Sequence, residues 1–184
     1  HPLPVLARGP GRATGIAVSA GTRSVPVATA GAGATAVRGG WGWLMGDQGS
    51  GYRIAVDGLR AAALADDGLA PPTALGEIVP AYFGEPDLRA VYNLVTGARG
   101  DRSRIAGLAP HIIRASATDP ACEAIVGQAV TDLAALIGAV IDAVHPAPQD
   151  RTVVLGGGVL SADGVMASRL TAAIGLSHPG YRVT

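Results

Sequence analysis

Asp47 is the single acidic residue in a glycine-rich segment, residues 39–52, that also contains two tryptophans. A carboxylate accepts hydrogen bonds from hydroxyl groups, and an indole ring offers a flat apolar face. Glycines let the backbone approach a ligand closely. Together these features suit a sugar, although a tight loop with two core tryptophans would have the same composition. So many glycines predict an irregular loop. The candidate sugar-binding residues are Gly40, Trp41, Gly42 and Asp47.

A second candidate lies in residues 19–24, where Gly21 and Thr22 stand between two apolar runs. A tight turn between strands presents backbone N–H groups and a hydroxyl together, which makes a cradle for phosphate oxygens. A plain β-turn would use the same residues.

A third candidate is the triple glycine at residues 156–158, which follows a β-branched run. Without Cβ atoms, Gly157 and Gly158 would let a base or a phosphate reach the backbone. A tight turn into the next helix is the alternative.

The front of the chain predicts an antiparallel meander of three strands. Short apolar runs at 15–20, 24–28 and 34–38 alternate with turn residues. Residues 31–33 are a plausible hairpin connection, and Pro26 predicts that its strand is at an edge of the sheet.

The rest of the chain predicts helices followed by a strand–turn–helix unit. Asp101 and the Asp119-Pro120 pair are helix-start signals, and Pro110 should perturb the middle of a helix. The expected fold class is therefore α/β. The expected helices cover 50–65, a short segment after 73, 88–97, 101–113, 120–144 and 161–174, with strands at 151–155 and from 182.

Composition excludes several classes of protein. All 14 basic residues are arginine, so a P-loop lysine and Schiff-base chemistry are ruled out. The formal net charge is zero, which implies neither a nucleic-acid partner nor a membrane surface. The lone Cys122 and four scattered histidines offer no metal site, and one free cysteine fits a cytoplasmic location. No uninterrupted apolar stretch of membrane-spanning length is expected.

The order of the motifs resembles the sugar-kinase/actin/heat-shock-ATPase superfamily. More narrowly, the GGWG-x-x-x-GD-x-GSGY string is similar to the N-acetylglucosamine kinase family, which is grouped with the BadF/BadG/BcrA/BcrD ATPases. The resemblance extends from about Gly15 to Thr184. It implies a ribonuclease-H-like, actin-type ATPase lobe formed by residues 1–184. Within it, 15–48 would form the meander and Trp loop, 50–145 the helical region, and 151–184 the unit beside adenosine.

The resemblance also implies ATP with Mg²⁺, an amino-sugar substrate and a role for each matched residue. Gly21 and Thr22 would form a phosphate-binding turn, with Ser24 beside the sugar. The amino-sugar would be held by Gly40, Trp41, Gly42 and Asp47. The nucleotide side would comprise Ala106, Gly157, Gly158 and Ala162, and the chain would hold no catalytic or metal-ligating residue of its own.

Three departures from the family pattern modify this interpretation. Arg23 replaces the second glycine of a Gly-Thr-Gly turn, and Gln48 stands where glutamate is usual. The family's first phosphate turn, Asp-Gly-Gly-x-x-x-Thr, and the acid of an Asp-Ala pair that acts as general base have no counterpart upstream of Gly15. The expected parent is an ATP-dependent kinase that converts N-acetylglucosamine to its 6-phosphate. The chain alone is expected to be a poor kinase or none, and either to dimerise or to lack an N-terminal lobe.

Two alternatives remain. One is a non-catalytic sugar or nucleotide sensor, or a degenerate remnant of a kinase. The other is the ATPase that activates a 2-hydroxyacyl-CoA dehydratase. Such activators hold an iron–sulfur cluster with two cysteines from each subunit, whereas this chain has only Cys122.

Overall fold

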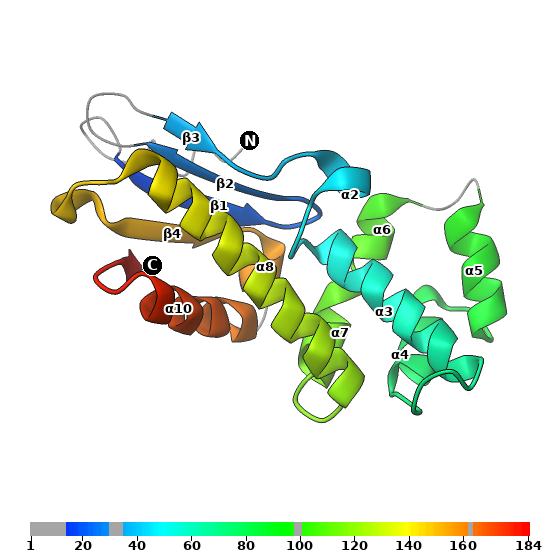
Figure 1. Cartoon of the computed structure of the whole chain (residues 1–184). Helices are drawn as coiled ribbons and strands as arrows, with labels where there is room; N and C mark the ends of the chain where they lie inside the picture. The colour runs from blue at the N-terminus through cyan, green and yellow to red at the C-terminus, as the bar shows by residue number, and fades with distance from the viewer. Residues whose placement is uncertain (1–13, 30–34, 98–100, 162–163) are drawn as a thin grey trace.

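A five-stranded sheet forms one half of the molecule in a computed structural model that describes residues 14–29, 35–97, 101–161 and 164–184 (Figure 1). The strand order is β3-β2-β1-β4-β5. Strands β1 to β3 are antiparallel neighbours, whereas β4 and β5 run parallel to β1. The predicted meander is confirmed, and the connection predicted at 31–33 lies outside the described residues. The strands are β1 (Gly15–Ala20), β2 (Ser24–Thr29), β3 (Thr35–Val37), β4 (Thr152–Gly156) and β5 (Arg182–Val183).

Pro26 does not place β2 at an edge, so that prediction is wrong. Strand β2 lies between β1 and β3, and Pro26 is opposite Val18 of β1. The Pro26 carbonyl accepts a hydrogen bond from the N–H of Arg38, just past the end of β3. In a strand, the nitrogen and the carbonyl of one residue point toward the same neighbouring strand, which for Pro26 is β3. Because β3 ends at Val37, the N–H that proline lacks would lie beyond the end of the β2–β3 pairing.

The register of β1 and β4 decides where the site forms. Ser19 of β1 is paired with Gly156 of β4 in parallel. When two parallel neighbouring strands end at paired residues, the turns that follow them lie side by side at the carboxyl end of the sheet. The turn after Ala20 and the turn after Gly156 therefore meet.

The helical elements follow the expected order. Ser50, Asp87, Asp101 and Asp119 each cap a helix N-terminus, with the side-chain oxygen accepting from a backbone N–H. The sequence capping signals are thus confirmed. The helices are α2 (Gly42–Met45), α3 (Gly51–Asp66), α4 (Leu75–Phe83), α5 (Leu88–Thr96), α6 (Arg102–Ala106), α7 (Ala109–Ala115), α8 (Pro120–Val144), α9 (Gly158–Ser161) and α10 (Val165–Ser177), with a 3-10 turn at Pro148–Asp150.

Three helices differ from the expectation. The Trp segment contains one helical turn, α2, so the prediction of a wholly irregular loop is wrong. The helix expected over 101–113 divides into α6 and α7, because Pro110 is tolerated only in the first turn of a new helix. The helix expected over 161–174 divides into α9 and α10, and α10 begins after Gly164 with φ of 70°. Ala162 lies outside the described residues.

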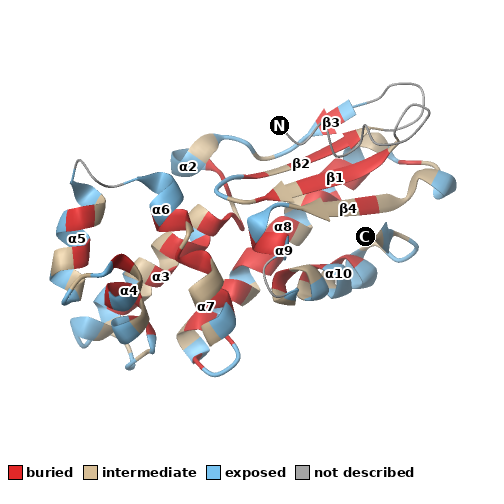
Figure 2. Cartoon of the chain, turned by 180° about the vertical axis from the view of Figure 1, so that it is seen from behind, coloured by how far each residue is buried: buried red, intermediate tan, exposed pale blue. Residues whose placement is uncertain are grey.

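Helix α8 is the longest element and lies along one face of the sheet, where it contacts β1, β2 and β3 (Figure 1). Figure 2 shows buried residues where the helices meet the sheet, and the buried positions of α8 recur at intervals of three and four residues, which places them mainly along one face of the helix. By length and hydropathy alone α8 could cross a membrane, although Glu123, Asp132 and Asp142 interrupt its apolar sequence. Its apolar stripe instead packs against the sheet and against α3, α7 and α10.

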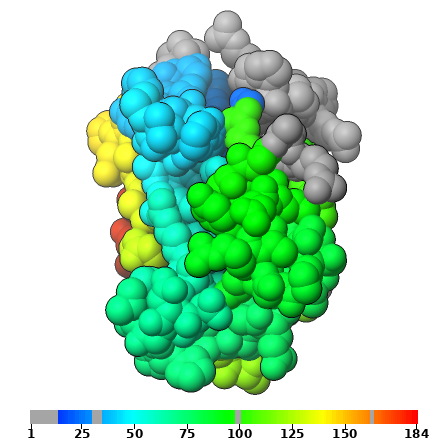
Figure 3. All heavy atoms as spheres, turned by 90° about the vertical axis from the view of Figure 1, so that its right-hand side faces the viewer, coloured from blue at the N-terminus to red at the C-terminus, as the bar shows by residue number. Residues whose placement is uncertain are grey.

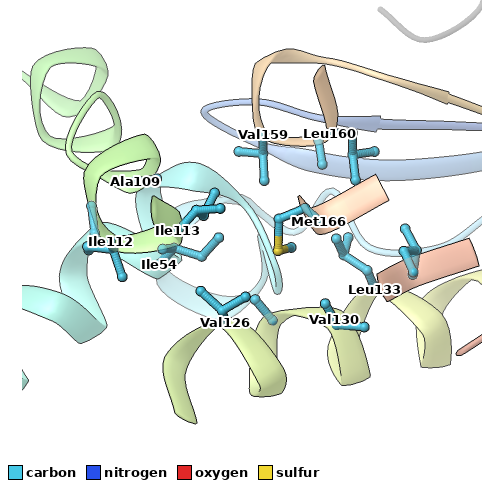
Figure 4. Close-up of a cluster of buried hydrophobic side chains, with 14 of the residues drawn as sticks. Ile54, Ala109, Ile112, Ile113, Val126, Val130, Leu133, Val159, Leu160 and Met166 are labelled. Carbon is cyan, nitrogen blue, oxygen red and sulfur yellow. The ribbon is translucent and has the colours of Figure 1, made fainter. Parts of the chain in front are cut away.

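One buried cluster joins the sheet to the helical region (Figure 4). Val126 of α8 lies toward Ile54 of α3 and Val130 lies beside Leu133, while Val159 and Met166 approach from α9 and α10. The helix that follows the triple glycine is thereby anchored in the core. The domain boundaries proposed from the sequence stay a prediction.

Asp119 joins the starts of α8 and α4. Its Oδ1 accepts from the N–H of Cys122 at 2.9 Å, and its Oδ2 accepts from the N–H of Ala74 at 2.7 Å and the hydroxyl of Thr73 at 2.9 Å. Burial raises the pKa of the Asp119 carboxyl, but these hydrogen bonds outweigh it, so the net pKa lies below the ordinary value.

We expect Asp119→Ala to lower the free energy of unfolding by about 2–4 kcal/mol, because three acceptor contacts are lost at a buried cap. Asp87→Ala is the matched control: this cap is exposed and accepts one N–H, from Ala90, so about 1 kcal/mol is expected. Because the pKa of Asp119 is lower in the folded than in the unfolded chain, its ionised carboxylate stabilises the fold at pH values above the unfolded-state pKa of about 3.9. This stabilisation is lost as the pH falls through the folded-state pKa. Urea unfolding of both variants from neutral pH to below pH ~4 tests this. A deficit in Asp119→Ala that persists unchanged at the acid end would contradict it.

Candidate functional site

A pocket of about 240 Å³ opens between the β1–β2 turn, the loop before α3 and the start of α6. Three segments far apart in sequence supply its walls: residues 22–23, 43–52 and 101–103. Figure 3 shows α2 and the adjoining loop, in light blue, beside the green helical segments at this end of the molecule. The lining residues are Thr22, Arg23, Trp43, Asp47, Tyr52, Asp101, Arg102 and Ser103.

Asp47 forms the floor of this first pocket. It is 2% exposed, and its φ of 59° lies in the left-handed region, which is uncommon outside glycine. Its Oδ1 is buried without a hydrogen-bond partner, as is Oε1 of the adjacent Gln48. Buried polar atoms are nearly always paired, so two neighbouring unpaired acceptors in a strained loop indicate a place for a ligand's donors.

The loop that carries Asp47 is fixed from behind. The hydroxyl of Ser24, which is fully buried, donates to the carbonyl of Gln48 at 2.5 Å. The N–H of Ser50 donates to the carbonyl of Asp47 at 3.0 Å. Ser24 thus supports the pocket from beneath, whereas the resemblance placed it beside the sugar.

Aromatic rings form one wall. Trp43 and Tyr52 meet edge to face with centroids 6.2 Å apart, and the guanidinium of Arg102 lies 5.9 Å from the Trp43 ring. Trp41, the tryptophan singled out from the sequence, does not line the pocket and is 71% exposed. Of the two tryptophans, Trp43 is the one that lines the pocket.

A second pocket, of about 320 Å³, adjoins the first and shares Thr22 and Ser103 with it. Much of its wall consists of residues with a small side chain or none. The pocket is lined by Gly21, Thr22, Gly51, Ser103, Ala106, Gly107, Pro110, Gly158 and Val159.

Gly51 holds the elements around the second pocket together. Its N–H donates to the carbonyl of Gly21 at 2.7 Å. A Cβ atom on Gly51 would lie 3.1 Å from Val159, 3.2 Å from the Gly21 carbonyl and 3.3 Å from the Ala106 carbonyl. A side chain at residue 51 would therefore require α9, the β1–β2 turn or α6 to move by a few tenths of an ångström.

The triple glycine has two separate roles. Gly157 has φ of 99°, and a Cβ there would lie 2.4 Å from the carbonyl oxygen of Ala20, so it lets the turn pack on β1. Gly158 has open space where a Cβ would project and lines the second pocket. Of the two, Gly158 is the one that a ligand could approach.

Helix α6 is positioned by a reciprocal contact with α4. The hydroxyl of Tyr82 donates to the carbonyl of Arg104 at 2.7 Å, and Arg104 donates in return to the carbonyl of Phe83 at 2.9 Å. Burial raises the pKa of the Tyr82 phenol, so the hydroxyl stays protonated as a donor. Ser103 and Ala106, which line the pockets, lie on the helix so fixed.

The structure brings most predicted residues to one cleft. Gly21, Thr22, Asp47, Ala106 and Gly158 line one or both pockets. Gly40 and Gly42 shape the loop with φ of 72° and 79° but line neither pocket, and Gly157 lies behind the turn. Sequence reasoning assigned no binding role to the other lining residues, which are Trp43, Gly51, Tyr52, Asp101, Arg102, Ser103, Gly107, Pro110 and Val159. The GGWGW and GSGY letters were a signal for Trp43, Gly51 and Tyr52; nothing local marked the others.

Comparison with known proteins agrees with this geometry. The family model for the BadF/BadG/BcrA/BcrD ATPases matches residues 5–183. The chain belongs to this ATPase family. The predicted family is thus confirmed, and ATP is the nucleotide that membership implies.

Two solved structures share the fold. A crystal structure from Chromobacterium violaceum, provisionally named an N-acetylglucosamine kinase, has a TM-score of 0.74 and 27% identity. One from Porphyromonas gingivalis with the same provisional name has a TM-score of 0.62 and 19% identity, which shows likeness of fold alone. Each alignment covers 92% of this chain and 54% of the other, so the chain spans about half the length of these structures. The predicted α/β fold of the actin-type ATPases is confirmed.

A curated relative points the same way over a shorter stretch. The N-acetyl-D-glucosamine kinase of Dictyostelium discoideum is 36% identical over 69 residues, which are 38% of this chain and 22% of that protein. The coarse assignment to an ATPase and sugar-kinase family rests on all three comparisons.

Cys122 is unsuited to hold an iron–sulfur cluster between subunits. Its side chain is fully buried in the core. Burial, together with the charge of Asp119, raises its pKa to about 12, which disfavours the thiolate that a metal requires. These observations count against the dehydratase-activator interpretation.

Proposed function

We propose that this chain is the sugar- and nucleotide-binding part of an ATP-dependent amino-sugar kinase that transfers a phosphoryl group to the 6-hydroxyl of N-acetylglucosamine. One observation carries the proposal: two pockets meet at Thr22 and Ser103. One contains a buried carboxylate oxygen without a partner, and the other is walled largely by residues with a small side chain or none. A sugar in the first and a nucleotide in the second would meet at Thr22.

The first pocket suits a sugar. Asp47 can only accept hydrogen bonds, and hydroxyl groups are the donors that a sugar offers. The exposed ring of Trp43 gives an apolar wall beside it. Asp47 would orient the ring so that the reacting hydroxyl faces Thr22, which is the positioning on which phosphoryl transfer depends.

The second pocket suits a nucleotide. Gly158, Ala106 and Gly107 leave room for a flat base and ribose, while Gly21 and Thr22 present the turn for phosphate oxygens. Among the described residues no group of three His, Cys, Asp or Glu side chains could hold a metal ion. Mg²⁺ would therefore be held mainly by the phosphates and water, and when bound it would neutralise charge on the transferred group.

We infer that the chain alone turns over slowly or not at all. The only carboxylates that line either pocket, within the described residues, are Asp47 and Asp101. Asp101 accepts from the N–H of Ser103 at 3.0 Å as a helix cap, and Asp47 is assigned to holding the sugar. That leaves no separate general base for the attacking hydroxyl.

A coupled ADP-release assay with ATP, Mg²⁺ and N-acetylglucosamine, run beside calorimetric titration of each ligand, tests this proposal. We expect both ligands to bind and ADP release to stay at the level of the sugar-free control. Turnover at about 1 s⁻¹ or more, typical of kinases, would contradict the inferred lack of a base. Failure of both ligands to bind would contradict the function itself.

The sensor interpretation rests on Arg23, the large side chain beside the phosphate turn. Sugar binding with no affinity for ATP would favour a sensor over a kinase part. The cytoplasmic location and the oligomeric state stay predictions from the sequence.

A further inference from the structure

Helix α6, with its two capping residues, contributes to both pockets. At its start, Asp101 and Arg102 line the first pocket. At its end, Ala106 and Gly107 line the second pocket, and Ser103 lines both. A ligand in either pocket would therefore lie against the same short helix.

The two ends of α6 are joined by the helix's own hydrogen bonds. The N–H of Ile105 donates to the carbonyl of Asp101 at 2.9 Å, and the N–H of Gly107 donates to the carbonyl of Ser103 at 3.0 Å. Of its five residues only Ile105 and Ala106 are buried. A helix so short is not stable without its neighbours, and a segment with few buried side chains is displaced at a low cost in free energy. We therefore expect α6 to shift as one unit.

Tyr82 joins this unit to α4. Its hydroxyl donates to the carbonyl of Arg104 at 2.7 Å, and it lies so close to Gly107 that a Cβ atom there would overlap it. Arg104 donates in return to the carbonyl of Phe83 at 2.9 Å. The Tyr82 ring is held separately, edge to face with Phe83 at a centroid distance of 4.8 Å and 5.1 Å from the ring of His111. The hydroxyl can therefore be removed without removing the contacts of the ring.

On the basis of the proposed function, we propose that neither the sugar nor the nucleotide binds well unless α6 is in place, and that Tyr82 is the positioning residue that holds it there while the site is empty. A ligand in one pocket selects the chains in which α6 is in place, and so prepares the other pocket. The apparent affinity for either ligand alone is reduced by the fraction of chains whose helix is displaced. The first ligand removes this reduction for the second, in either order and by the same factor.

Tyr82→Phe tests the proposal by calorimetric titration. We expect its affinity for N-acetylglucosamine alone, and for a non-hydrolysable ATP analogue alone, to fall about 2–10-fold, because one hydrogen bond that holds α6 is lost. With one ligand saturating, the affinity for the other should return to within about twofold of the unsubstituted chain. A residue with a structural role alone would weaken binding whether or not the other ligand is present.

Two further variants accompany this one. Arg104→Gln removes the bond to the carbonyl of Phe83 and should show the same loss and the same recovery. Tyr92→Phe alters an exposed tyrosine on α5 and should change neither affinity. Circular dichroism and melting temperatures establish that each variant is folded.

Adenosine distinguishes coupling through α6 from direct contact between the two ligands. It lacks the phosphates that would reach Thr22, so it would not touch a sugar in the first pocket. Saturating adenosine should therefore still restore the sugar affinity of Tyr82→Phe.

Trp43 gives an optical readout of the same shift. It lines the first pocket, and the guanidinium of Arg102 on α6 lies 5.9 Å from its ring. In a chain with Tyr82→Phe and Trp41→Phe, Trp43 is the one remaining tryptophan. Adenosine should change its emission with no sugar present, although the residues that line the second pocket do not include Trp43.

The outcomes separate the two proposals. A loss of affinity in Tyr82→Phe that the other ligand does not restore overturns this inference and leaves the proposed function standing. Unchanged affinities in both Tyr82→Phe and Arg104→Gln overturn it as well, as does unchanged Trp43 emission at saturating adenosine. Recovery with the ATP analogue but not with adenosine assigns the coupling to contact between sugar and phosphates, and so also overturns it. Binding of neither ligand to the unsubstituted chain overturns the proposed function together with this inference.

Discussion

Asp47→Asn is expected to weaken binding of N-acetylglucosamine by about 10–100-fold, because hydrogen bonds to a charged group are worth ~1.5–3 kcal/mol. The substitution keeps the shape of the side chain but removes the charge and one acceptor oxygen. The free energy of unfolding should stay the same or rise, since the unsubstituted chain buries an Oδ1 atom without a partner. The substitution should thus lower the sugar affinity without lowering the free energy of unfolding, as is typical of a residue whose role is binding.

Calorimetric titration with N-acetylglucosamine and urea unfolding give the two readouts for Asp47→Asn. Asp57→Asn is the matched control, because Asp57 lies in an exposed ion-pair group on α3 with Arg53 and Arg60. It should change neither the affinity nor the stability by more than a small amount. Unchanged sugar affinity in Asp47→Asn would remove Asp47 from the site.

Gly49→Ala is expected to lower the free energy of unfolding by about 3 kcal/mol or more. Gly49 has φ of 68°, and a Cβ there would lie 2.4 Å from Cγ of Leu133 and 2.7 Å from the carbonyl oxygen of Ala129. A left-handed alanine costs about 1–2 kcal/mol, and overpacking adds about 1–3 kcal/mol. In a chain of this size the melting temperature should fall by roughly 6–12 °C.

Gly42→Ala separates the backbone effect from the packing effect. Gly42 also has a positive φ, 79°, but nothing lies within 4 Å of its hypothetical Cβ. We expect a loss of about 1–2 kcal/mol. Thermal unfolding of both variants measures the difference. Equal losses would mean that α8 can move away from the loop, and that the contact with Leu133 does not fix the position of Asp47.

Local sequence signals were sufficient to predict helix α8 and the β-meander. The Asp119-Pro120 pair marked the start of α8, and its apolar stripe marked the length to Val144. The alternation of residues 15–38 predicted the meander. In each case a few neighbouring residues determine the backbone, so no distant contact has to be known.

Long-range placement could not be predicted from local patterns. Whether Pro26 sits at an edge depends on where β3 stops pairing, and the choice between Trp41 and Trp43 depends on the single turn of α2. Arg102 and Ser103 reach the pocket from α6, which packs against α3 and is linked to α4 by the hydrogen bonds of Tyr82 and Arg104. Such residues carry no motif, so only the folded chain identifies them.

The prediction that the glycine-rich segments form one site came from the family resemblance and not from the composition. The structure supplies a physical reason for their meeting: Ser19 and Gly156 are paired in register, so the turns that follow β1 and β4 are neighbours. Gly51 then closes α3 onto the same point through its N–H to Gly21. One cleft follows from that pairing.

The most direct test is a crystal structure of the chain with N-acetylglucosamine and a non-hydrolysable ATP analogue. We predict a sugar hydroxyl within hydrogen-bond distance of Oδ1 of Asp47, and the adenosine beside Gly158 and Ala106, with the phosphates reaching Thr22. Either ligand bound away from the cleft that joins these residues would contradict the account.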